Sequence, residues 1–273
     1  MLERTRGLVT MRQAAALLAA SLLFPGAGHG QSEDELAKQL SNPVSSLISV
    51  PFQLNHDFDI GPEDGDRTLL NVQPVIPVSI DANWNMISRT ILPVITQDDA
   101  VPSGGSQSGI GDLVQSLFFS PRASTAGGWT WGVGPVLSLP TASDDALGSQ
   151  KWGAGPTAVA LKQTAEGWTY GALVNHVVSF AGDASRADVS STFLQPFLAK
   201  GIGGGRTLTV NFESSYDWES SQWTVPANFT YSKVTRVGDQ LVSWAAGARY
   251  YFEAPNSGPE WGLRFVFTLL YPR

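Results

Sequence analysis

Beyond the first thirty residues the chain has two histidines, His56 and His176. Hydrolysis of the serine type needs a serine hydroxyl and a histidine ring side by side. In the segment NHVVSF, His176 and Ser179 are three residues apart, a spacing that points them to opposite faces of a strand. His56 adjoins Asp57 near a predicted strand end and has no serine partner in view. The pattern argues against an enzyme, and we expect no catalytic residues.

Two further segments have the composition of ligand sites without the required spacing. GIGGGR, residues 201–206, lacks the Lys followed by Ser or Thr of a phosphate loop, so we interpret it as a flexible turn. DFDIGPEDGD, residues 57–66, is rich in acids, but Gly61 and Pro62 break the spacing of a calcium loop. The chain contains no Cys, which excludes disulfides and thiolate metal sites. We therefore expect no cofactor and no metal.

The composition narrows the class of protein. Only 15% of the 273 residues are charged, against about 25% in ordinary soluble domains. The net charge of −7 argues against nucleic acid as a partner. The many Trp and Phe residues argue against disorder. After Gly30 no apolar run reaches the roughly 18 residues that a membrane-spanning helix needs.

Residues 1–30 have the order of a secretory signal peptide. Three arginines precede an apolar stretch from Ala14 to Phe24, and small residues follow up to Gly30. Met11 would serve equally well as the start, because the stretch after it is already a compact signal. The sequence therefore predicts export, with residues 31–46 as a leader and residues 47–273 as the folded domain.

The rest of the chain alternates between apolar and polar residues with a period of two. Leu208, Val210 and Phe212 share one phase, while Thr209 and Asn211 occupy the other. This is typical of strands with one apolar and one polar face. Prolines inside several strands argue for a shorter or bulged count. Twelve strands are predicted, at 47–56, 68–79, 84–95, 112–120, 129–139, 152–162, 168–180, 190–200, 207–216, 223–233, 241–252 and 261–271.

Aromatic residues mark the ends of these strands. In a soluble sandwich, large rings should lie in mid-strand, in the core. Rings at strand ends are typical of the girdles that a membrane barrel places at the two lipid interfaces. The predicted girdle residues are Trp84, Trp129, Trp152, Trp168, Trp218, Trp223, Trp261 and Tyr271.

The connections between strands fall into two sets. If the N-terminus is periplasmic, the odd-numbered connections are mostly longer and hold most of the acids, whereas the even-numbered ones are shorter and hold most of the bases. Long outer loops and short inner turns are the outer-membrane pattern. The sequence therefore predicts an all-β fold, a closed antiparallel transmembrane β-barrel of about 12 strands with a short N-terminal helix. A soluble secreted β-sandwich is the alternative fold.

Four segments carry a resemblance to known proteins. They are LAKQLSNPVSSLISVPFQLN (residues 36–55), GPEDGDRTLLNVQPVIPVSIDANWNMISRTILPVI (61–95), GIGDLVQSLFFSP (109–121) and GPVLSLPTAS (134–143). They resemble a family of bacterial outer-membrane transporter proteins. The family is associated with meta-pathway phenol degradation, and some members carry the misleading label neuromedin U. The resemblance implies an outer-membrane channel in a Gram-negative bacterium. Such barrels commonly end in an aromatic residue read by the assembly machinery, whereas here Pro272 and Arg273 follow Tyr271.

Twelve tilted strands give a backbone radius of about 12 Å and leave a lumen of about 10 Å. Its polar lining is either a constriction that orients a solute by charge or a structural network that fills a narrow barrel. The candidate lumen residues are Arg89, Asn175, Asn211, Glu213, Arg249 and Arg264, together with Gln53, Asn55, Asn71, Gln73, Asn85 and Asn228.

The leader is predicted to contain a short helix. Ser32 and Glu35 have capping-box spacing, and Leu36 and Leu40 lie on one helical face. The helix could enter the lumen, close its periplasmic mouth or simply be mobile.

The function expected from these observations is a passive, porin-like channel for small molecules, aromatic or hydrophobic ones included. Its partners would be outer-membrane lipid, the assembly machinery and an unidentified solute. The alternatives are a non-transporting structural or adhesive barrel and, less favoured, a barrel hydrolase of the outer-membrane phospholipase type.

Overall fold

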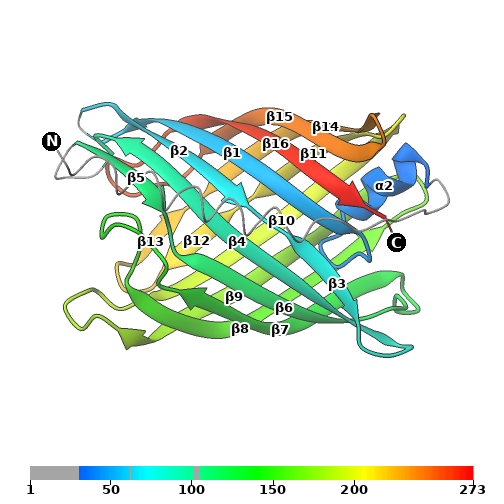
Figure 1. Ribbon diagram of the computed structural model, residues 1–273, viewed down its shortest axis with the longest axis horizontal. Helices are drawn as coiled ribbons and strands as arrows, with labels where there is room; N and C mark the ends of the chain where they lie inside the picture. The colour runs from blue at the N-terminus through cyan, green and yellow to red at the C-terminus, as the bar shows by residue number, and fades with distance from the viewer. Residues whose placement is uncertain (1–30, 62, 101–104, 273) are drawn as a thin grey trace, which may run out of the picture. The chain divides into compact units, whose positions relative to one another are not determined.

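The computed structural model describes residues 31–61, 63–100 and 105–272 (Figure 1). The predicted signal peptide, residues 1–30, lies outside this range. One helix, α2 (Glu33–Leu40), precedes the strands. The strands are β1 (Ile48–Ile60), β2 (Gly65–Val72), β3 (Val75–Ser79), β4 (Trp84–Asp98), β5 (Ser106–Ile110), β6 (Leu113–Pro121), β7 (Trp129–Leu139), β8 (Lys151–Gln163), β9 (Trp168–Gly182), β10 (Ser190–Gly203), β11 (Arg206–Phe212), β12 (Ser214–Asp217), β13 (Gln222–Thr224), β14 (Pro226–Val237), β15 (Gln240–Tyr251) and β16 (Trp261–Tyr271).

All strands belong to one antiparallel sheet that closes on itself. Neighbours in the chain pair with each other, and β16 returns to pair with β1 from Ile48↔Tyr271 to Phe58↔Trp261. The sixteen segments form a closed barrel of 12 strands, because four of the barrel strands are interrupted. Closure leaves no unpaired sheet edge. The predicted fold class and strand number are therefore confirmed.

The interruptions account for part of the proline problem. Pro74 lies in the gap between β2 and β3, where its carbonyl accepts a hydrogen bond from the Thr90 N–H at 3.1 Å. Pro226 begins β14, directly after the gap at Val225. Glu213 separates β11 from β12.

The largest difference from the predicted strand bounds is at β5, which begins at Ser106, whereas the prediction began this strand at residue 112. In addition, β1 and β14 each end four residues later than predicted, at Ile60 and Val237. The other predicted bounds agree within three residues.

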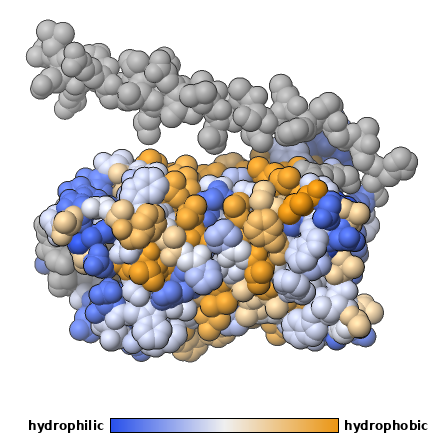
Figure 2. All heavy atoms as spheres, turned by 90° about the horizontal axis from the view of Figure 1, so that it is seen from below, coloured by the Kyte–Doolittle hydropathy of each residue, from blue (hydrophilic) through white to orange (hydrophobic). Residues whose placement is uncertain are grey.

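The exposed face of the barrel is apolar. Along β16 the residues Leu263, Phe265 and Phe267 are exposed, while Arg264 and Thr268, on the alternate phase, are buried. Figure 2 shows the result on one side of the molecule, where apolar residues form a band between two hydrophilic ends. This is the reverse of a soluble sandwich, in which the buried phase is the apolar one.

Rings gather at both ends of this band. At the end that carries the longer connections, Phe58 stacks on Trp261 at 4.3 Å, and Tyr216 meets Trp218 at 4.8 Å. At the end with the short turns, the Lys200 ammonium lies 4.9 Å above the Trp168 ring. The predicted girdle residues divide between the long-loop end (Trp152, Trp218, Trp223 and Trp261) and the short-turn end (Trp84, Trp129, Trp168 and Tyr271). All seven of these tryptophans are exposed. Within the described residues, no helix combines the length and apolarity needed to cross a bilayer.

Candidate functional site

The inner face of the barrel carries polar and charged side chains in its half nearer the long loops. Five of the six residues predicted to line the lumen lie on the inward phase of their strands: Arg89 on β4, Asn175 on β9, Asn211 on β11, Arg249 on β15 and Arg264 on β16. Glu213, the sixth, continues the inward phase of β11. Their neighbours in the chain point outward, because side chains alternate along a strand.

Glu213 and Arg264 form the strongest contact of this inner surface. The guanidinium donates two hydrogen bonds to the carboxylate, at 2.8 and 2.6 Å. Its Nε donates a third to Asn55 Oδ1 at 2.7 Å. The Gln195 amide also reaches Glu213, at 3.4 Å. A two-pronged pair of this kind fixes both side chains in position.

A second ionic cluster centres on Asp57, which is fully buried. Arg67 and Arg249 each approach its carboxylate to 3.4 Å, and the Arg249 guanidinium also lies 5.2 Å above the Tyr251 ring. The sequence interpretation placed Asp57 and Arg67 in a loop, which is wrong: β1 runs on to Ile60 and β2 begins at Gly65. The polar phase of β1 simply continues, from Asn55 to Asp57, which was the signal that could have found it.

Arg89 differs from the other three arginines in making no ion pair among the described residues. It donates one hydrogen bond, to the neutral Gln73 amide oxygen at 3.0 Å. Its charge interacts with Glu213, as do the charges of Arg249 and Arg264. We call Asp57, Arg67, Arg89, Glu213, Arg249 and Arg264 the lumen network. Deeper in the polar lining, Asn228 donates to Asn211 at 2.8 Å.

The half of the lumen nearer the short turns is apolar and filled. Side chains on the inward phase of four strands, Ile87, Phe118, Leu161 and Leu173, form a buried cluster there, with Phe193 and Phe197 of β10 packed against it. Ile87, Phe118 and Leu161 have no exposed surface at all. The predicted lining was polar throughout, so this apolar section was missed.

The leader crosses the lumen in this section. In α2, Leu36 and Ala37 pack with Val234 of β14 and Leu270 of β16. A few residues later, Val44 packs into the apolar cluster on β4, β6, β8 and β9. These two groups of strands lie on opposite sides of the barrel. The segment from α2 to β1 therefore spans the interior and obstructs it.

Polar contacts fix α2 at the short-turn mouth. Ser32 caps the helix by accepting a hydrogen bond from the Glu35 N–H at 3.2 Å. Asp34 accepts one from the Gly205 N–H at 2.7 Å, in the turn between β10 and β11. Gln163, at the end of β8, donates to the Lys38 carbonyl at 2.8 Å. The helix is thus held to the wall from two sides.

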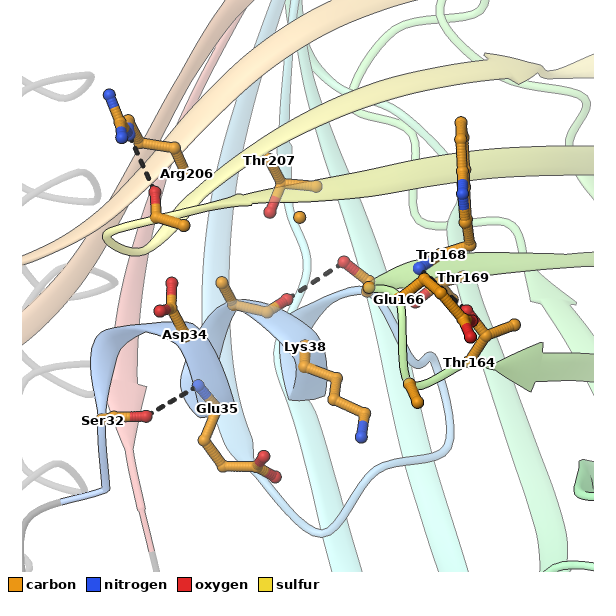
Figure 3. Close-up of a pocket in the computed structure, with 16 residues that line it drawn as sticks. Ser32, Asp34, Glu35, Lys38, Thr164, Glu166, Trp168, Thr169, Arg206 and Thr207 are labelled. Carbon is orange, nitrogen blue, oxygen red and sulfur yellow. Dashed lines mark hydrogen bonds between the residues drawn. The ribbon is translucent and has the colours of Figure 1, made fainter.

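A pocket of about 370 Å³ lies between α2 and the adjoining turns (Figure 3). Its walls come from the helix, from the turn between β8 and β9, and from the hairpin of β10 and β11. Figure 3 shows Asp34 and Lys38 on the helix side, with Glu166 and Arg206 on the turns. The pocket shows that α2 does not fill the short-turn mouth completely at this place.

The residues that could serve hydrolysis are not assembled. The His176 ring pairs with the Thr192 hydroxyl at 2.9 Å, whereas the Ser179 hydroxyl donates to Asp188 at 3.3 Å. The His56 ring pairs with Thr68 at 2.8 Å. Across the described residues, no three His, Cys, Asp or Glu side chains converge as a metal site would require.

Carboxylates at the long-loop end are held in their charged form. Lys151 donates to Asp188 at 3.0 Å, and this hydrogen bond with the lysine charge lowers the pKa of Asp188. Hydrogen bonds from the Ser185 N–H and hydroxyl lower the pKa of Asp183 in the same connection. These two carboxylates therefore keep their charge to lower pH than ordinary aspartates do.

Comparison with known proteins places the fold in a class. No family model and no curated protein matches the chain. Among solved structures, an outer membrane channel from Pseudomonas putida F1 has a TM-score of 0.64 at 16% identity, over 91% of this chain and 100% of that one. Outer membrane phospholipase A from Escherichia coli has a TM-score of 0.47 at 9% identity, over 89% of this chain and 99% of that one. The closed sheet and the likeness to the Pseudomonas putida channel show that the chain has the fold of a bacterial outer-membrane β-barrel.

Proposed function

We propose that the protein is a channel of the Gram-negative outer membrane that passes small molecules passively through its barrel. The observation that carries the proposal is a closed barrel with an apolar exposed band and a charged interior. The likeness in fold to an outer membrane channel supports it. The family resemblance of residues 36–143 adds aromatic and hydrophobic molecules as candidate solutes. Its other partners would be membrane lipid and the assembly machinery.

The position of the leader implies that passage needs movement. Residues 32–47 cross the lumen. The central side chains of the apolar cluster that surrounds them are fully buried, so the cluster is tightly packed. We therefore expect a small or intermittent conductance from the intact chain. Removal of residues 32–46 should increase it by about tenfold or more, since an obstructing segment is the main barrier in a narrow pore.

The test compares the intact mature protein with the deleted form in planar bilayers and in liposome swelling. If neither form conducts ions or passes solutes, while both keep the heat-dependent gel shift of a folded barrel, the proposal that the barrel passes small molecules is wrong. The packed interior favours the second candidate in that case, a non-transporting structural barrel. Enzymatic activity is not part of the proposal, because His176 and Ser179 have separate partners.

A further inference from the structure

The lumen network carries more positive than negative charge. It contains four guanidiniums, from Arg67, Arg89, Arg249 and Arg264, and two carboxylates, from Asp57 and Glu213. The carboxylate of Glu213 accepts two hydrogen bonds from Arg264 and so compensates the charge of that arginine. Asp57 is shared between two arginines at 3.4 Å, and Arg89 donates its hydrogen bond to a neutral amide oxygen, that of Gln73. Two positive charges are left without a matching carboxylate.

Some guanidinium N–H donors of the lumen network have no hydrogen-bond acceptor. The Nε atoms of Arg67 and Arg249 are buried and have no hydrogen-bond partner. The Arg249 side chain is 8% exposed. A buried charge is costly unless it is paired and hydrogen-bonded. The interior therefore offers guanidinium donors, backed by excess positive charge, to an anion that enters from the long-loop end.

An apolar surface begins directly beside these charges. Ile87 is one inward position from Arg89 along β4, and it belongs to the buried apolar cluster. On β10, Phe193 and Phe197 flank Gln195, whose amide reaches Glu213. A ligand held by the arginines would place its far end against these rings. The lumen thus joins an anion-binding half to an apolar half.

We propose that the lumen network binds a small amphiphilic organic anion, a carboxylate attached to an apolar body. Arg89 and Arg249 supply the charge, because the two carboxylates of the network leave these positions undercompensated. Guanidinium and carboxylate match in planar geometry and charge. The apolar body lies toward Ile87, Phe193 and Phe197. This inference names the solute class for the proposed channel and in that sense rests on the proposed function.

Binding can be measured without transport. The full mature protein in detergent is titrated with 4-fluorobenzoate, followed by ¹⁹F NMR, and then with two matched probes. The uncharged 4-fluorobenzyl alcohol lacks the carboxylate, and trifluoroacetate lacks the apolar body. The fluorobenzoate should bind at least about tenfold more tightly than either, since one charge-assisted hydrogen bond is worth about that factor. Equal binding of fluorobenzoate and the alcohol would overturn the site.

Variants locate the site. Arg89→Gln and Arg249→Gln should each weaken fluorobenzoate binding about tenfold and leave the alcohol unchanged. Arg122→Gln removes an exposed arginine in the turn between β6 and β7 and is the matched control. If Arg89→Gln behaves like Arg122→Gln, the inference is wrong. If Arg89→Gln does not fold, the comparison of the three probes on the unaltered protein still tests whether the lumen prefers an amphiphilic anion.

The outcome is separable from that of the proposed function. If the protein passes no solute yet binds fluorobenzoate through Arg89 and Arg249, passage fails and the binding site stands. If it conducts but shows no preference for the anion, passage stands and the site fails. In the second case the lumen network is a structural brace only.

Discussion

Arg264 of β16 braces Glu213 across the lumen, at the single residue that separates β11 from β12. The two hydrogen bonds of 2.8 and 2.6 Å join strands that are not neighbours in the sheet, because β14 and β15 lie between them. At Glu213 the backbone N–H bonds to the Pro226 carbonyl at 3.1 Å, beside another gap. The ion pair between Arg264 and Glu213 therefore lies where the strand hydrogen bonding of the barrel is interrupted.

Breaking this brace from one side should destabilise the barrel. The side chains of Arg264 and Glu213 are 3% and 19% exposed, and removing one partner of such a pair costs about 3 kcal/mol, because the other charge is left without compensation. We expect Arg264→Gln and Glu213→Gln each to lower the free energy of unfolding by that amount. Denaturant unfolding in lipid vesicles, followed by tryptophan fluorescence, measures it.

The double variant Glu213→Gln with Arg264→Gln is the control for this experiment. It removes both charges, so it should be less destabilised than the sum of the single variants. If the single losses simply add, the two residues act independently and the brace has no energetic meaning.

Alternation predicted the strands, and ring placement with the length and charge of the connections then favoured a barrel over a sandwich. All of these patterns depend only on local sequence. Alternation also gave the inward phase of Arg249 and Arg264. The end of β1 was misplaced because acids such as Asp57 are typical of loops, although the polar phase of the strand continues through this residue. Its partner Arg249 lies on β15, and the sequence of β1 does not reveal that pairing. Cross-lumen pairs join residues far apart in the chain, so no local pattern reveals them.

The leader illustrates the same limit in another way. The capping box at Ser32 and Glu35 and the face with Leu36 predicted the helix, which the structure has from Glu33 to Leu40. The position of this helix could not be predicted without knowing which inner surface of the barrel it packs against. Val234 and Leu270 are inward apolar residues near the short-turn ends of their strands, where a polar lining was expected. These residues are apolar there because the helix packs on them.

Loosening the helix should open the lumen. Leu36 is fully buried against Val234 and Leu270, and replacing such a leucine by a polar residue costs roughly 2–5 kcal/mol of local packing. We expect Leu36→Asn to raise bilayer conductance and the susceptibility of residues 31–47 to protease while the barrel keeps its heat-dependent gel shift. Lys38→Asn, on the exposed face of the same helix, is the matched control. Equal conductance of the two variants would show that α2 does not limit passage.

The connection between β9 and β10 should loosen in acid. Since Lys151 lowers the pKa of Asp188 below the ordinary 3.8, the contribution of this contact is fully present above that pH and is lost as the pH falls through the lower folded value. A spin label at Ala184→Cys should report greater mobility below about pH 3.8.

The same label in an Asp188→Asn background separates the contributions. Asp183 also has a lowered pKa, through Ser185, and titrates in the same range. The Asn variant should be more mobile at neutral pH and should lose only the part of the acid response that Lys151 causes. An unchanged response would assign it wholly to Asp183.

The two ends of the barrel should face different compartments. The absence of Cys allows single cysteines to report on this. Ala184 lies in the connection between β9 and β10, at the long-loop end, and Ala126 lies in the connection between β6 and β7, at the short-turn end. Both residues are exposed. Short turns of outer-membrane barrels are periplasmic, so a membrane-impermeant maleimide should label Ala184→Cys in intact cells and label Ala126→Cys only after lysis. The reverse pattern would invert the orientation and place the mouth occupied by α2 at the cell surface. If both cysteine variants were instead recovered and labelled in the soluble periplasmic fraction, the membrane location would be contradicted, since the exposed apolar band of the barrel needs lipid around it.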